Sequence, residues 1–299
     1  MKENRTCCLA ARSALFCLGL SLVVPGAMKS QTMPEPPAQV AVSPPRFELE
    51  LGSQPVNDSL KVLNLGEDPV TVEVSVYPWV LDEANQVQIV EPDEQSLDQW
   101  MVINPLRFTI PGGGSQVVRF SIRPRVQPEP GEHRAIIYLK QILPEIAEEN
   151  APLRVSFRLG VGVYAWVGEV VREATVHSVN PVPSSRPPSF EIDVASRGNA
   201  HVRLEGQYAV WRAESFPGTD STSPIEGINT PTAAVPESIL EAGSLPTLPV
   251  LPDTRRKLTL QLLEQLPPGE YVLDLNGAVA GVSIDQAIAF EVRTESEEE

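Results

Sequence analysis

The sequence has very few of the residues that cross-link secreted proteins or bind metals. Only three cysteines occur among 299 residues, and Cys7, Cys8 and Cys17 all lie near the N-terminus. If that stretch is removed on export, the remaining chain has no thiol, which excludes a disulfide framework, a thiolate metal site and a cysteine nucleophile. The three histidines are far apart in the sequence and lack ligand spacing, so we expect no zinc site.

Basic residues are also scarce. The chain has 23 Lys and Arg against 39 Asp and Glu, a net charge of −16. That balance argues against a nucleic-acid-binding protein, which needs a basic face to neutralise phosphates. It also argues against adsorption to an anionic membrane surface. With 30 prolines and 19 glycines the chain is interrupted too often for long helices, which favours short strands joined by turns.

The sequence also lacks the motifs of common enzymes. The run Gly112–Ser115 is not followed by the Gly-Lys-Ser/Thr of a phosphate-binding loop, and no Gly-x-Ser-x-Gly elbow occurs. Residues 82–85 lack the ligand alternation of a calcium loop. We therefore predict that the protein is not an enzyme, with no catalytic residues, no metal and no cofactor.

The N-terminus has the layout of a secretory signal peptide. The basic residues Lys2, Arg5 and Arg12 are followed by 12 apolar or small residues, 13–24, and by a small-residue exit at 25–27. A stable membrane span needs about 20 apolar residues, so no membrane insertion is expected after cleavage. A short N-terminal helix in a cytosolic protein is the alternative.

Apolar residues alternate along much of the remaining chain, which is the pattern of half-buried strands. Every second residue from Val70 to Val76 is valine, and Phe190, Ile192 and Val194 repeat the pattern in the second half. The number and spacing of such segments favour an all-β protein with two immunoglobulin-like β-sandwich domains in tandem behind a signal peptide. The expected order is a signal peptide at 1–27, a flexible lead-in at 28–40, an N-terminal sandwich at 41–167, a C-terminal sandwich at 168–293 with a long loop at 213–249, and an acidic tail at 294–299.

One predicted strand is unusually long and apolar. From 153 to 163 every second residue is apolar, which places Leu153, Val155, Phe157, Leu159, Val161 and Val163 on one face. Eleven residues in extended form span roughly 36 Å, whereas ordinary strands have about 5–6 residues. Either its own domain buries this stripe completely, or part of it is a surface for another chain.

The first half of the expected mature chain resembles the N-terminal domain of PapD-like periplasmic chaperones of the chaperone–usher pathway of pilus assembly. The stretches that carry the resemblance are Val42–Arg46, Leu60–Asn64, Val102–Pro105, Phe108–Gly112, Val117–Arg119, Gly131–Arg134 and Ile142–Pro144. One departure lies at Glu132-His133-Arg134, where the family usually has Arg-Glu-Ser.

The resemblance implies a periplasmic chaperone whose partners are incomplete pilin-like subunits and an outer-membrane usher. In such a chaperone the last strand of the first domain is lent to the subunit, and the implied anchors here are Leu153, Val155, Phe157 and Leu159. Two basic residues bind the terminal carboxylate of the subunit, and Arg46 and Arg158 match them by position. The alternative is a structural or adhesive sandwich protein of the envelope that has no client.

Overall fold

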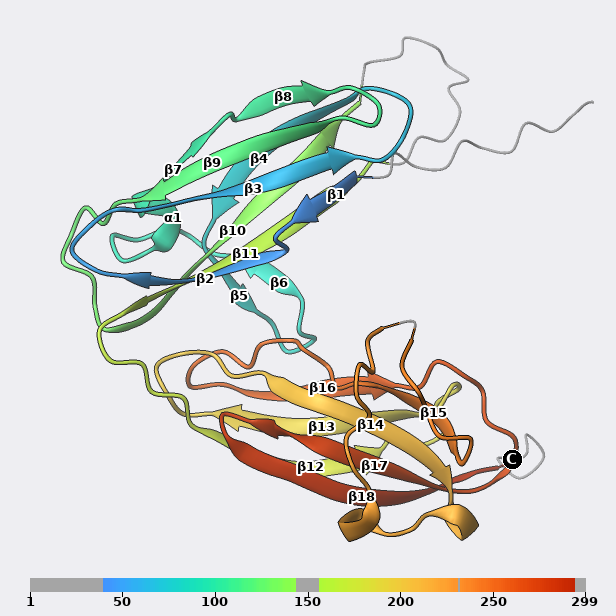
Figure 1. The fold of residues 1–299 in the computed structure, drawn as a ribbon. Helices are drawn as coiled ribbons and strands as arrows, with labels where there is room; N and C mark the ends of the chain where they lie inside the picture. The colour runs from blue at the N-terminus through green and yellow to red at the C-terminus, as the bar shows by residue number, and fades with distance from the viewer. Residues whose placement is uncertain (1–39, 144–155, 231, 294–299) are drawn as a thin grey trace, which may run out of the picture. The chain divides into compact units, whose positions relative to one another are not determined.

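A computed structural model describes residues 40–143, 156–230 and 232–293 (Figure 1). These residues belong to one compact unit. Their regular structure is almost entirely β-strand, grouped in two pairs of sheets, and each pair encloses a hydrophobic core. The prediction of an all-β protein with two tandem sandwiches is confirmed.

The first sandwich consists of two sheets. One has the order β1-β3-β9-β7, with strands Val40–Ser43, Val56–Asn64, Ser115–Ile122 and Met101–Asn104. The other has the order β2-β11-β10-β4-β8, with strands Arg46–Leu51, Arg158–Val167, Gly131–Ile142, Val70–Tyr77 and Arg107–Ile110. Neighbouring strands are antiparallel except β2 and β11, which run parallel. The connections hold a hairpin of β5 (Trp79–Leu81) and β6 (Val87–Ile89) and the short helix α1 (Leu97–Trp100).

Period-two alternation explains which side of each strand faces the first core, because successive side chains of a strand point to opposite faces. Val70, Val72 and Val74 of β4 are buried in this core, as the alternation predicts. Val161 and Val163 of β11 are fully buried in it as well. The same alternation directs the intervening residues of these strands to the outer face of their sheet.

That outer face carries the polar groups of the candidate functional site. The strand register places Arg46 opposite Gly162 and Glu132 opposite Trp166, so alternate residues of β2, β10 and β11 share the face. Its charged side chains include Arg46, Glu48, Glu132 and Arg134.

The second sandwich also has two sheets. One has the order β12-β13-β16, with strands Ala174–Pro181, Ser189–Ser196 and Arg255–Gln261. The other has the order β15-β14-β17-β18, with strands Ile239–Ser244, Leu204–Arg212, Gly269–Val279 and Val282–Val292. All of these pairs are antiparallel. Phe190, Ile192, Tyr271 and Leu273 are among the residues that fill the shared core.

Two segments differ from the sequence-based expectation. The strand expected over 153–163 begins at Arg158 and continues to Val167. It extends to Val167 because β10 pairs with it over 158–167 and β2 over 162–167, which alternation within a single segment does not reveal. The segment expected as a loop at 213–249 contains the 3-10 turns η1 (Ala213–Ser215) and η2 (Thr219–Ser221) as well as strand β15, which pairs with β14.

The buried amide of Asn64 joins three segments of the first sandwich. Its Nδ2 donates to the carbonyl oxygens of Asp68, Ile110 and Pro111, at 2.7, 3.2 and 3.2 Å. Its Oδ1 accepts a hydrogen bond from the Gly66 N–H, at 3.1 Å. Removing the amide takes one hydrogen bond from each of these carbonyl groups, of which that of Ile110 is buried.

We expect Asn64→Ala to lower the free energy of unfolding by about 1–3 kcal/mol. The measurement is urea denaturation followed by tryptophan fluorescence. Asn57→Ala is the matched control, because Asn57 is an exposed residue of the same strand, and its effect should stay within about 0.5 kcal/mol. Equal effects of the two substitutions would contradict the role given to Asn64.

Candidate functional site

The structure divides the predicted apolar stripe into parts with different surroundings. Val161 and Val163 are sealed in the first core. Phe157 and Leu159 are only partly buried and pack against the same core. Phe157 lies just before β11, and its carbonyl oxygen accepts a hydrogen bond from Gln141 N–H at 3.1 Å. Leu153 and Val155 lie outside the described residues.

One edge of β11 is only partly covered. Strand β10 pairs with β11 over Arg158–Val167. On the other side, β2 pairs with it only over Gly162–Val167. Among the described residues, the edge at 158–161 has no strand on that side, so its outward backbone N–H and C=O groups are available for pairing.

The two predicted carboxylate-binding residues, Arg46 and Arg158, lie on one face of the sheet, but each contacts a different partner. Arg46 lies opposite Gly162, and Arg158 is four residues earlier on β11, so their backbones are about 13 Å apart along the strand. The Arg158 guanidinium lies 3.5 Å from the centre of the Tyr138 ring, a cation–π contact. Arg46 Nε pairs with Glu48 Oε1 at 3.0 Å.

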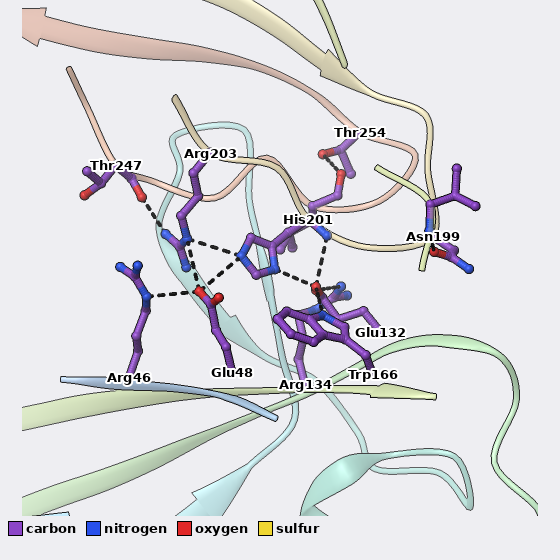
Figure 2. Close-up of polar contacts among 12 residues, drawn as sticks. Arg46, Glu48, Glu132, Arg134, Trp166, Asn199, His201, Arg203, Thr247 and Thr254 are labelled. Atoms are coloured by element: carbon purple, nitrogen blue, oxygen red, sulfur yellow. Dashed lines mark hydrogen bonds and ion pairs between the residues drawn. The ribbon is translucent and has the colours of Figure 1, made fainter. Parts of the chain in front are cut away.

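The basic group that converges with Arg46 is Arg203 of the second sandwich. Its Nε is 4.0 Å from Glu48 Oε1, the same oxygen that Arg46 contacts (Figure 2). Arg203 is held in place because its Nη1 donates to the Thr247 carbonyl oxygen at 2.5 Å and its Nε donates to His201 Nε2 at 3.2 Å. Two guanidinium groups from distant parts of the chain therefore share one carboxylate.

Glu48 lies at the surface end of this arrangement. Its side chain is 35% exposed and that of Arg46 is 48% exposed. Ion pairs at such exposure contribute on the order of 1 kcal/mol or less. The Glu48 carboxylate is therefore a weakly held partner that another carboxylate can replace.

Glu132 forms the buried end of the same arrangement, and its side chain is fully buried. Figure 2 shows the groups of His201, Trp166 and Arg134 that surround its carboxylate. Oε2 accepts hydrogen bonds from the backbone N–H of His201 at 2.9 Å and from Trp166 Nε1 at 3.2 Å, and it lies 2.5 Å from His201 Nδ1. Oε1 accepts one from Arg134 Nη1 at 3.0 Å. A buried carboxylate requires such partners, because an unpaired charge in a dry environment is very costly.

These contacts determine the protonation of Glu132. Burial raises its pKa, but the hydrogen bonds from His201 and the charge of Arg134 outweigh burial and lower the pKa to about 2. The carboxylate is therefore ionised at every pH at which the protein is expected to work.

An apolar contact supports the same region. Trp79, Leu81, Ile136 and Tyr164 of the first sandwich form a small buried cluster with Leu251 of the second. The Tyr164 ring also lies 4.2 Å from the His201 ring, centre to centre. Polar and apolar contacts thus hold the charged residues in a defined arrangement.

Sequence reasoning missed Glu132, His201 and Arg203 as members of a site. Glu132 and His201 are 69 residues apart and belong to different sandwiches, so no local pattern links them. Glu132 stood out in the sequence only as part of a departure from the usual family residues.

The described residues contain no group of three or more His, Cys, Asp and Glu side chains placed to hold a metal ion. None of the helices in the described ranges is long and apolar enough to cross a membrane.

Comparison with known proteins gives a likeness of fold. No family model matches the sequence, and no curated protein matches it. Similar solved structures include the class 5 fimbriae chaperone CfaA, with 11% identity, 86% of this chain and 100% of that chain covered, and a TM-score of 0.41. A chain of the CsuC–CsuE complex of a chaperone and a tip adhesion subunit, from Csu pili of Acinetobacter baumannii, has 12% identity, coverage of 84% and 98%, and a TM-score of 0.41.

A third similar structure is a PapD-like domain of human CEP192. It has 16% identity, covers 51% of this chain and 98% of that domain, and has a TM-score of 0.31. Two of these three structures thus contain a chaperone of fimbriae or pili, and the third is a PapD-like domain.

The pKa of Glu132 leads to a pH-dependence prediction. The folded-state pKa is about 2 and the ordinary value is 4.5, so the stabilisation is complete above pH 4.5 and is lost as the pH falls toward 2. In Glu132→Gln this pH-dependent loss should disappear, and stability at pH 7 should fall by about 1–3 kcal/mol because charged hydrogen bonds are lost.

The measurement is the midpoint of thermal unfolding of both proteins from pH 7 to pH 2. Glu129→Gln makes the same charge change at an exposed residue and should follow the wild-type curve. If Glu132→Gln also follows that curve between pH 4.5 and 2, the assigned pKa is wrong.

Proposed function

We propose that this protein is a periplasmic chaperone that binds incomplete pilin-like subunits by strand addition and delivers them to an outer-membrane usher. The observation that carries the proposal is the open edge of β11 at residues 158–161, next to the partly buried Phe157 and Leu159. The signal-like N-terminus supports export, and the resemblance of the first half to PapD-like chaperones supports the type of client.

Strand addition follows from the chemistry of an open edge. An extended partner segment gains main-chain hydrogen bonds at the edge and apolar contacts from alternate side chains. Leu159 and Phe157 supply such side chains here, since each packs against the core yet is incompletely covered. We extend the proposed surface through Val155 to Leu153, the anchors that the sequence implies.

The proposed carboxylate site lies on the outer face of the same sheet. Arg46 offers the terminal carboxylate of a client a planar pair of donors, which suits bidentate binding. Arg158 lies near the open edge and keeps its implied role in the proposal. Glu48 already occupies Arg46, so a client carboxylate has to displace the Glu48 carboxylate.

One observation favours the alternative of an envelope structural or adhesive protein without a client. Val161 and Val163, half of the described apolar stripe, are buried in their own sandwich. The experiments below separate the two functions, because only a chaperone depends on the remaining half.

We expect Phe157→Asp and Leu159→Asp each to reduce recovery of a complex with a co-expressed pilin-like subunit encoded beside this gene by about tenfold or more, since a buried charge opposes apolar contact. The measurement is the amount of subunit that copurifies with the tagged chain. Val102→Asp is the control, because Val102 is 60% exposed on β7, and it should leave recovery unchanged. Thermal unfolding of each variant verifies the fold. Unchanged recovery with both folded edge variants favours the alternative without a client.

The carboxylate site gives an opposed pair of substitutions. Arg46→Ala should lower recovery of the same complex about tenfold, the effect of losing a charged hydrogen bond. Glu48→Gln should raise it, because the internal competitor for Arg46 is neutralised. Glu50→Gln is the matched control, since Glu50 is an exposed residue of β2 on the same face as Glu48. A decrease with Glu48→Gln would show that Glu48 positions the client rather than competing with it.

A further inference from the structure

The second sandwich contains a polar region that the chaperone proposal does not use. It lies on the face of the sheet β15-β14-β17-β18 that is turned away from the core. On β17, Leu273 and Leu275 point into the core, so Asp274 and Asn276 point to the other face. The register places Gln207 of β14 opposite Asn276, and Asn276 opposite Asp285 of β18.

Two adjoining cavities lie over this face. They have volumes of about 220 Å³ and about 740 Å³. Gln207 and Asn276 of the sheet and Ile225 of the loop line both of them. The smaller cavity also contains Asp274, and the larger one contains Asp285. Together they offer space of the size that small-molecule ligands occupy.

Two buried acceptors in the smaller cavity have no donor among the described residues. Asp274 is 1% exposed and its Oδ1 accepts no hydrogen bond, while its Oδ2 accepts one from Asn276 Nδ2 at 3.0 Å. Gln207 is 6% exposed and its Oε1 has no partner. Thr222 lies beside Asp274, but its hydroxyl donates to the Thr219 carbonyl oxygen at 3.0 Å. Buried acceptors are rarely left unmatched, so the missing groups are hydrogen-bond donors.

The charge of the cavities selects the kind of donor. Glu205 and Asp285 line the larger cavity and Asp274 the smaller one, and among the described residues that line either cavity none is Lys, Arg or His. Burial raises the pKa of Asp274, the nearby charge of Asp285 adds to that rise, and the Asn276 amide opposes it. A cation bound between the two carboxylates relieves both the burial and the repulsion.

The spacing indicates a cation with two charged ends. Asp274 pairs with Ala287, two residues from Asp285, so the two aspartates are diagonal neighbours on adjacent strands. Such neighbours are about 7–8 Å apart. A short aliphatic chain with an ammonium group at each end spans that distance.

We propose that these cavities bind a small organic diamine, with one primary ammonium group donating to Asp274 Oδ1 and Gln207 Oε1 and the other paired with Asp285. Ile225 contacts the aliphatic part of the ligand, since it lines both cavities. The site is separate from the β11 edge and from Arg46, so its existence does not depend on the chaperone function.

The test is isothermal titration calorimetry of the purified full chain with 1,4-diaminobutane. Wild type should give saturable binding, and Asp274→Asn should weaken it about tenfold or more, as loss of a hydrogen bond to a charged group implies. Glu270→Gln removes the same charge from an exposed residue of β17 outside both cavities and should bind like wild type. 1,4-Butanediol, which has no charge, should not bind.

Asp285→Asn provides a second variant, because Asp285 is exposed and its substitution leaves the fold intact even if Asp274→Asn does not fold. It should also weaken diamine binding. The proposal is overturned if wild type shows no saturable binding, if Asp285→Asn and a folded Asp274→Asn bind as tightly as wild type, or if Ca²⁺ binds in place of the diamine and is lost in both variants.

Discussion

A single buried carboxylate organises the candidate functional site. Glu132 has no exposed side-chain surface, yet it is charged, and four groups donate to it or lie within hydrogen-bonding distance of it. Two of these groups belong to His201 of the second sandwich. Because a buried charge is tolerated only when its partners are in place, the position of Glu132 constrains His201, and His201 in turn contacts Arg203. The position of Arg203 beside Glu48 therefore depends on the buried contact of Glu132 with His201.

The site thus has a rigid interior and an exchangeable surface. The interior groups are buried and hydrogen-bonded, and Tyr164 and Leu251 pack beside them. The surface pair of Arg46 and Glu48 is half exposed and weakly bound. The buried groups therefore hold Arg203 in position through His201, whereas the ion pair of Arg46 with Glu48 is exchangeable.

Local sequence patterns predicted the fold but only part of the site. The valines of 70–76 identified β4 because alternation is a property of neighbouring residues. The strand expected at 153–163 has its correct inward side at Val161 and Val163, but among the described residues it runs from Arg158 to Val167, since pairing with β10 and β2 sets its limits. The contact between Glu132 and His201 depends on two segments 69 residues apart, and no periodicity in either segment encodes it.

The short parallel pairing of β2 with β11 has a consequence for any chain that joins the sheet at residues 158–161. The backbone of Arg46 already occupies the position beside Gly162. An added segment cannot pair with β11 beyond this point, because the same edge of a strand cannot pair with two strands at once. Strand β2 therefore limits the register of such a segment. A segment that pairs with β11 at residues 158–161 must end before Gly162, where β2 begins to pair.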